Sequence, residues 1–175
     1  TMVKAIREEF NSQFSVEKYQ QLLQEIQVEF PNQLDFRVAE SPIFVANDFK
    51  SKLMIASNDI IDAILKPDFK ELTERAIPEN LYVPNEGKHP HFLAIDFAIT
   101  KNEIGEIEPQ LIELQGFPSL FAYQWYLSQK YQKTFYKNPK YSAFFNRLSI
   151  ASYDNKIKKV LIGNENVENT ILLEI

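Results

Sequence analysis

Two β-forming runs joined by a polar loop lie in the middle of a chain whose first third is patterned for helices. The first run, 92–100, is rich in β-branched and aromatic residues and has no helical period. The polar stretch 101–109 contains Gly105 and is followed by a second β-forming run at 110–115. This pattern predicts a β-hairpin. With helices predicted before and after it, the expected fold class is α+β, with helices around an antiparallel hairpin.

Helical patterns flank the hairpin on both sides. Between residues 15 and 30 the apolar residues recur every three or four positions, and Ser15 is a suitable N-cap. Pro31 ends this helix, because the residue before a proline avoids the α region. A short extended piece is expected at 34–38. Further helices are predicted over 47–65, 68–76, 119–133 and 141–150, with an exposed loop over 81–91.

The last part of the chain changes character again. The runs 157–162 and 170–175 are rich in β-formers and are predicted to be strands. Because the chain stops inside an apolar, β-forming run, we interpret it as a fragment. The expected organisation is one domain over 1–150 and the first strands of a truncated second α/β domain over 151–175.

Composition argues against several classes of protein. The 24 acidic and 19 basic residues give a net charge of −5, which disfavours bulk binding to nucleic acid or to anionic membranes. No uninterrupted apolar run exceeds about four residues, so neither a membrane span nor a signal peptide is predicted. The chain has no Cys, and its four Gly cannot form a Rossmann or P-loop motif. The expectation is a cytoplasmic protein that acts on a small molecule.

Three polar residues in the hairpin are the best candidates for chemistry. Glu113 and Gln115 are two positions apart and therefore point to the same face of their strand. In the obvious hairpin register, Asp96 lies across from them. Two carboxylates and an amide carbonyl are the oxygen ligands that Mg²⁺ prefers. The alternative is that all three belong to an ordinary solvated strand face.

Two further groups of residues can be interpreted either as functional or as purely structural. His89 and His91 flank Pro90 and have the spacing of a Zn or Ni ligand pair, but an exposed pair of loop histidines is the simpler interpretation. Four lysines alternate with aromatic residues, as in proteins that bind single strands of nucleic acid; they are Lys130, Lys133, Lys137 and Lys140. The acidic net charge favours an amphipathic helix end with solvated lysines and buried rings instead.

The hairpin residues resemble the metal-binding end of the ATP-grasp superfamily. The matching segments are Ala-Ile-Asp96-Phe and, after the loop, Leu-Ile-Glu113-Leu-Gln115-Gly-Phe-Pro118. In that superfamily an Asp on one strand and a Glu-x-Asn on the next hold the Mg²⁺ ions that bridge the ATP phosphates. Asp96 matches the Asp, Glu113 the Glu and Gln115 the Asn. Gln keeps the carbonyl donor and adds one methylene.

The order of the elements resembles the circularly permuted ATP-grasp proteins, of which glutathionylspermidine synthase is the familiar type. The chain resembles a bacterial family of this kind more than any named enzyme. The resemblance implies a following Rossmann-like domain, with 158–163 and 170–175 as its first strands, and a nucleotide-binding lobe beyond Ile175.

The same resemblance implies a function. It is that of an ATP-dependent carboxylate–amine ligase, with Mg²⁺ and ATP as cofactors of the full-length protein and Asp96, Glu113 and Gln115 as metal ligands. In such a ligase ATP phosphorylates a carboxylate and an amine displaces the phosphate. The chain alone is expected to be inactive, because the nucleotide lobe is not part of it. The alternative function is a non-catalytic binding or scaffold domain that keeps the fold.

Overall fold

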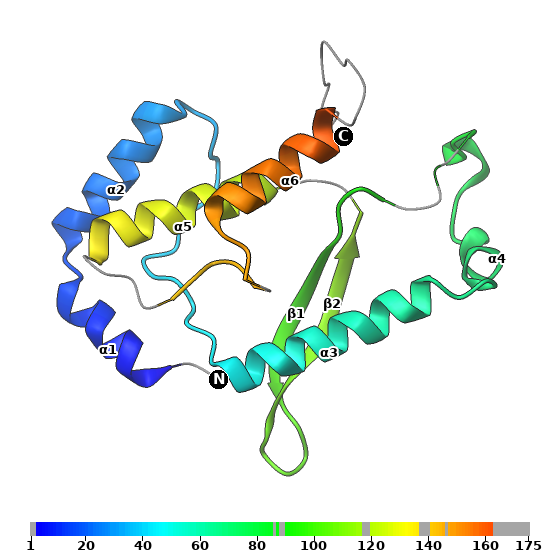
Figure 1. Ribbon diagram of the computed structural model, residues 1–175, viewed down its shortest axis with the longest axis horizontal. Helices are drawn as coiled ribbons and strands as arrows, with labels where there is room; N and C mark the ends of the chain where they lie inside the picture. The colour runs from blue at the N-terminus through cyan, green and yellow to red at the C-terminus, as the bar shows by residue number, and fades with distance from the viewer. Residues whose placement is uncertain are drawn as a thin grey trace. The chain divides into compact units, whose positions relative to one another are not determined.

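The computed structural model describes residues 3–85, 87, 90–116, 120–136, 141–145 and 147–162. The backbone contacts divide the chain into two compact units, each of which is described by itself. The first, 45–118, is called the hairpin unit. The second consists of 2–44 together with 119–175 and is called the aromatic unit. Figure 1 shows the elements of both units.

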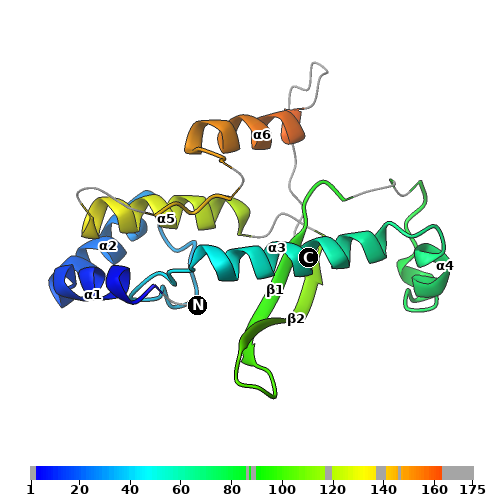
Figure 2. The ribbon, with the colours of Figure 1, turned by 60° about the horizontal axis from the view of Figure 1, so that its bottom comes forward.

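The hairpin unit combines helices with an antiparallel sheet, which confirms the predicted mixture of α and β structure. Its elements are helix α3 (Asn47–Ile64), helix α4 (Phe69–Glu74), the 3-10 helix η1 (Glu79–Leu81), strand β1 (Ala94–Lys101) and strand β2 (Ile107–Gln115). Helix α3 lies across the hairpin in contact with β2 (Figure 2). The Nζ atom of Lys52 on α3 donates to the carbonyl oxygen of Ile107 at 3.1 Å and lies 3.8 Å from the Glu106 carboxylate.

The hairpin loop is shorter than predicted, because β2 begins at Ile107 and the turn occupies only 102–106. The Gly105 amide donates to the Asn102 carbonyl at 2.9 Å, and the Asn102 side chain accepts the Glu106 amide at 2.8 Å. Gly105 has a φ of 80°, a left-handed conformation that favours glycine. Pro109, which the sequence placed in the loop, pairs with Ile99 inside the ladder, as an edge strand permits.

The aromatic unit is built from helices in the described part of the chain. They are α1 (Lys4–Gln13), α2 (Val16–Glu29), α5 (Phe121–Phe135) and α6 (Ile150–Ile162). Helices α2 and α5 pack side by side (Figure 1). Their apolar faces enclose a core with α1 and the irregular segment that follows α2. The buried members of this core are Phe10, Leu22, Ile26, Val38, Phe44, Tyr131, Phe135 and Tyr136.

Helix α2 begins and ends where its sequence predicts. The Ser15 hydroxyl accepts the Lys18 amide at 3.3 Å, and the helix ends before Pro31. Two hydroxyls fix the neighbouring irregular segment to the helices. Tyr19 donates to the Val38 carbonyl at 2.5 Å, and Tyr131 donates to the Ala39 carbonyl. The expected extended piece at 34–38 is therefore an irregular segment held by side-chain hydrogen bonds.

Replacing Ser15 by alanine is expected to lower the free energy of unfolding of the aromatic unit by about 1 kcal/mol, because an amide of the first turn of α2 loses its acceptor. Urea unfolding followed by circular dichroism measures the change. Ser15→Asp is the matched control, because a carboxylate caps equally well. A Ser15→Ala protein as stable as the wild type would contradict the capping role.

The sequence-based prediction of the last described segment is wrong in two places. Residues 141–149 contain no helix in the described positions, and 157–162, predicted to be a strand, belongs to helix α6. The reason is local. Ile150, Tyr153, Ile157 and Val160 follow a helical spacing that begins before the predicted strand.

Hydrogen bonds at the start of α6 stabilise it as a helix. The Ser149 hydroxyl accepts the Ser152 amide at 3.2 Å, and the Ser152 hydroxyl accepts the Ser149 amide at 2.8 Å, in the reciprocal manner of a capping box. Asp154 and Lys158 form an ion pair at 2.9 Å one turn apart. The predicted strand 170–175 lies outside the described residues, so the division into 1–150 and 151–175 stays a prediction.

Within the described ranges, no helix has both the length and the apolar character that a bilayer crossing requires.

Candidate metal site on the hairpin

The structure brings the three predicted metal ligands to one face of the hairpin. Asp96 pairs directly with Glu113 across the two strands, and Gln115 pairs with Ala94. Directly opposed residues of an antiparallel pair point to the same side, as do residues two apart on one strand. The geometric prediction for Asp96, Glu113 and Gln115 is thus confirmed.

A β-bulge determines which face of the hairpin each β2 side chain occupies. Asp96 pairs with Glu113 but Phe97 pairs with Leu111, so Ile112 is the extra residue. Without this bulge, Leu111 would share the face of Glu113, because the two residues are two positions apart. The bulge instead puts Leu111 on the face of Phe97. The result is a hairpin with one polar and one apolar face.

The polar face is defined by four pairs across the strands. Its members are Ala94, Asp96, Ala98 and Thr100 of β1 and Glu108, Gln110, Glu113 and Gln115 of β2. Two amides on this face donate to carboxylates on the same strand. Gln110 donates to Glu108 at 3.0 Å, and the Gln115 amide nitrogen donates to Oε1 of Glu113. The side chains of the polar face therefore contact one another as well as solvent.

The donor set on this face fits a hard divalent cation. Asp96 and Glu113 are exposed and Gln115 is half-buried, so the carboxylates meet solvent and a cation can reach them. Two carboxylates and one amide oxygen leave ligand positions for waters or phosphate oxygens, as Mg²⁺ normally requires. No group of three or more His, Cys, Asp or Glu side chains with metal-binding geometry occurs among the described residues. A three-ligand site on this face would therefore need the Gln115 amide oxygen as its third ligand.

The histidine pair lies partly outside the described residues, which include His91 but not His89. His91 is exposed in the loop before β1. The described part of the chain therefore gives the pair no geometry, and the interpretation as a pair of exposed loop histidines stays a prediction.

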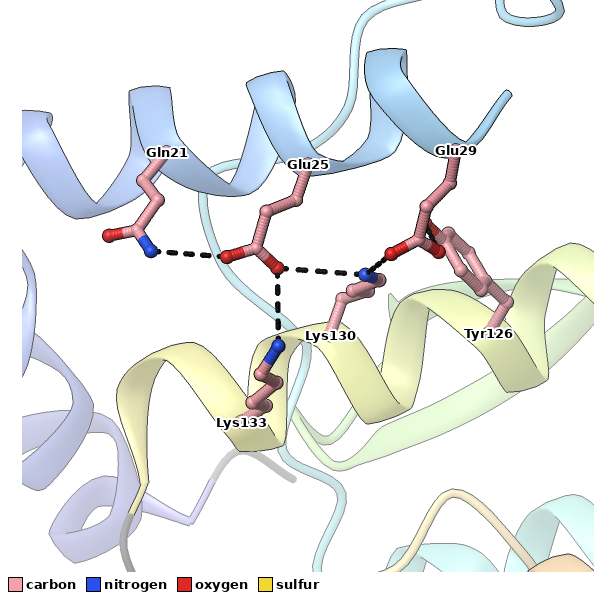
Figure 3. A network of polar contacts seen from close by, with 6 residues as sticks. All are labelled: Gln21, Glu25, Glu29, Tyr126, Lys130 and Lys133. Atoms are coloured by element: carbon pink, nitrogen blue, oxygen red, sulfur yellow. Dashed lines mark hydrogen bonds and ion pairs between the residues drawn. The ribbon is translucent and has the colours of Figure 1, made fainter. Parts of the chain in front are cut away.

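The first two lysines of the basic and aromatic run are engaged in ion pairs between α2 and α5 (Figure 3). The Lys130 Nζ atom binds the Glu29 carboxylate and lies 3.6 Å from Glu25. The Lys133 Nζ atom also lies 3.6 Å from Glu25. Glu25 and Glu29 thus compensate the charges of Lys130 and Lys133. The other two lysines of the run, Lys137 and Lys140, lie outside the described residues. The pattern of Lys130 and Lys133 reflects packing against an acidic helix face.

This network was missed in the sequence because its partners are about a hundred positions apart. The detectable signal was an acidic pair one turn apart, Glu25 and Glu29, facing a basic pair at helical spacing, Lys130 and Lys133. Tyr126 completes the network by donating to the second oxygen of Glu29 at 2.8 Å. The hydrogen bond from Lys130, followed by that from Tyr126, lowers the pKa of Glu29.

Comparison of the chain with models of protein families, with curated proteins and with solved structures gave no match.

Proposed function

We propose that the polar face of the hairpin holds the Mg²⁺ of an ATP-dependent carboxylate–amine ligase of the ATP-grasp type. The observation that supports this proposal is the direct pairing of Asp96 with Glu113, with Gln115 on the same face. Two carboxylates so placed repel each other, and a dication between them removes that repulsion. The ordering of the three ligands by a paired sheet reduces the entropy that metal binding costs.

Each residue has a distinct task in this proposal. Asp96 and Glu113 supply the negative charge that attracts the cation, and Gln115 supplies a neutral oxygen. In the free protein the Gln115 amide nitrogen donates to Glu113. A half-turn of the amide group presents its oxygen in the same direction. Gln115 would therefore donate a hydrogen bond to Glu113 without metal and be a metal ligand with it. Bound Mg²⁺ supplies neutralisation of charge on the phosphates of ATP.

Manganese broadening of nuclear magnetic resonance signals tests the proposal in the 175-residue chain. Mn²⁺ prefers the same oxygen ligands and broadens the signals of nearby nuclei. We expect low concentrations to broaden the amide signals around Asp96, Glu113 and Gln115 first, and excess Mg²⁺ to restore them. Glu113→Gln removes one charge with little change of size and should abolish the selective broadening.

The matched control is Glu108→Gln, which makes the same exchange on the same polar face two pairs from Asp96. It should leave the broadening around Asp96 and Glu113 intact. Broadening spread evenly over all exposed carboxylates, or equal loss in both variants, would contradict a specific site. That outcome would favour the alternative function, a scaffold domain whose polar face is held together by its own amides.

A further inference from the structure

A pocket of about 500 Å³ opens in the aromatic unit, and none of the residues of the metal site lines it. Three segments line it: the irregular stretch 39–44, one face of α5, and 141–144 together with Tyr153 of α6. Seven aromatic side chains dominate the wall; they are Phe44, Phe121, Trp125, Tyr131, Tyr141, Phe144 and Tyr153. No charged residue is among the described residues that line it. Pockets of this size and character are typical of sites for small organic molecules.

Two hydrogen-bonding groups on lining residues have no partner in the described structure. The Trp125 Nε1 and Tyr141 Oη atoms are both shielded from solvent, and neither makes a hydrogen bond. The hydroxyl of Tyr131, on the same wall, shows the usual arrangement, since it donates to the Ala39 carbonyl. Buried donors are nearly always paired in folded proteins, so each unpaired group requires an explanation.

The chemistry of the wall restricts what could pair with these groups. An uncharged, largely apolar wall disfavours a carboxylate or a phosphate, because burying an unpaired charge is costly. Aromatic walls favour flat rings, which stack or meet them edge to face. Trp125 can only donate, and burial raises the pKa of Tyr141, so the hydroxyl keeps its proton at neutral pH. The Tyr141 hydroxyl can donate as well as accept, so a hydrogen-bond acceptor is the one kind of group that can pair with both residues.

We infer that this pocket binds a neutral, planar heteroaromatic molecule that carries a ring nitrogen or a carbonyl as acceptor. The acceptor pairs with Trp125 Nε1, with Tyr141 Oη or with both, and the flat ring lies among the aromatic side chains. Solvent does not reach the two donors in the free protein, so pairing with the ligand requires the side chain of Trp125, of Tyr141 or of both to move as the ligand enters. This site is independent of the proposed metal site, which lies on residues of the other unit.

Trp125 is the one tryptophan of the chain, so its indole N–H gives a single, assignable signal in a nitrogen–proton correlation spectrum. Quinoline and indole are suitable probes of similar size. Both are flat and neutral at pH 7.5, but quinoline carries a ring-nitrogen acceptor whereas indole has only a donor. We expect quinoline to shift the Trp125 indole signal downfield with saturation, and indole to bind roughly five- to twenty-fold more weakly.

Tyr141→Phe removes one donor and keeps the ring. It should weaken quinoline binding by a similar factor, and by more than it weakens indole binding, because only quinoline can accept from both donors. Tyr136→Phe is the matched control, because its shielded, partnerless hydroxyl is not on a residue that lines the pocket. That variant should bind quinoline as the wild type does.

Three results would overturn the inference: indole binding as tightly as quinoline, no saturable shift of the Trp125 signal at millimolar quinoline, or equal losses in the two tyrosine variants. The comparison of the two probes on the wild-type chain decides the question even if a variant folds poorly.

Discussion

Replacing Phe10 by alanine is expected to lower the free energy of unfolding of the aromatic unit by about 3–5 kcal/mol. Phe10 of helix α1 is 2% exposed and belongs to the buried core of this unit. Its centroid is 4.9 Å from that of Phe135 and 6.1 Å from those of Phe44 and Tyr136. Removing it takes away apolar burial and leaves a cavity that three rings from distant segments cannot all fill.

Urea unfolding followed by the fluorescence of Trp125 measures this loss, because Trp125 belongs to the same unit. Phe30→Ala is the matched control. Phe30 is 47% exposed and makes an edge contact with Tyr126 at 5.1 Å. Its removal should cost about 1 kcal/mol or less, since little burial is lost and water can enter the space. Equal losses in the two variants would show that Phe10 does not occupy the core of a cooperatively folded unit.

Replacing Lys130 by methionine is expected to lower the free energy of unfolding by about 1–2 kcal/mol at neutral pH. The Lys130 side chain is 11% exposed, binds Glu29, and lies 5.2 Å from the centroid of the Tyr126 ring. Methionine keeps the apolar stem but leaves the carboxylates without their buried cation. The loss stays moderate because Glu29 is 46% exposed and can be hydrated.

Lys133→Met is the matched control, because Lys133 pairs with the same Glu25 but its side chain is 73% exposed. An exposed pair contributes little, so we expect a change of about 0.5 kcal/mol or less. A Lys133 variant as destabilised as the Lys130 variant would show that burial of the cation does not determine its contribution.

The pH dependence gives a second test of the same network. The pKa of Glu29 is lowered, chiefly by the Lys130 hydrogen bond, and that of Glu25 is lowered, chiefly by the Gln21 hydrogen bond and also by the two lysines. Stability from a carboxylate with a lowered pKa is present above its ordinary value of 4.5 and is lost as the pH falls through the lowered value.

Lys130 behaves in the opposite sense. Burial opposes its charge, but the Glu29 hydrogen bond and the charges nearby outweigh burial and raise its pKa above 10.5. Its stabilising effect is present below 10.5 and is lost as the pH rises through the raised value. The stability difference between wild type and Lys130→Met should therefore be flat between about pH 5 and pH 10 and shrink on both sides. A difference that persists undiminished at pH 3 would indicate lost packing instead of lost ion pairing.

The sequence predicted best where a local rule decides the structure. The N-cap at Ser15 and the helix that ends before Pro31 follow from neighbours in the chain. The face shared by Glu113 and Gln115 follows from strand alternation, and its pairing with Asp96 follows from the hairpin. The bulge at Ile112 was also within reach, because strict alternation through Leu111 would have put an apolar side chain among the carboxylates.

The prediction failed where the residues that make a contact are far apart in the sequence. It also failed where a helical pattern was read from the wrong starting residue. The ion pair of Lys130 with Glu29 joins two helices that are far apart in the sequence. The spacing within each helix indicates a charged face but not which face it meets. The pocket around Trp125 needs three separate segments to meet. Helix α6 was missed because a window that began at Ile157 left out Ile150 and Tyr153, the first members of its helical face.

The aromatic unit is made from two stretches of chain, 2–44 and 119–175, with the whole of 45–118 between them. Contact between α2 and α5 therefore closes a long loop, and its entropic cost has to be met before the core around Phe10 can form. That cost grows only logarithmically, by about 0.6 kcal/mol for each doubling of the loop. The stability of the helical core is consequently almost insensitive to the length of the intervening segment, so the hairpin is free to vary in size at little cost to the core.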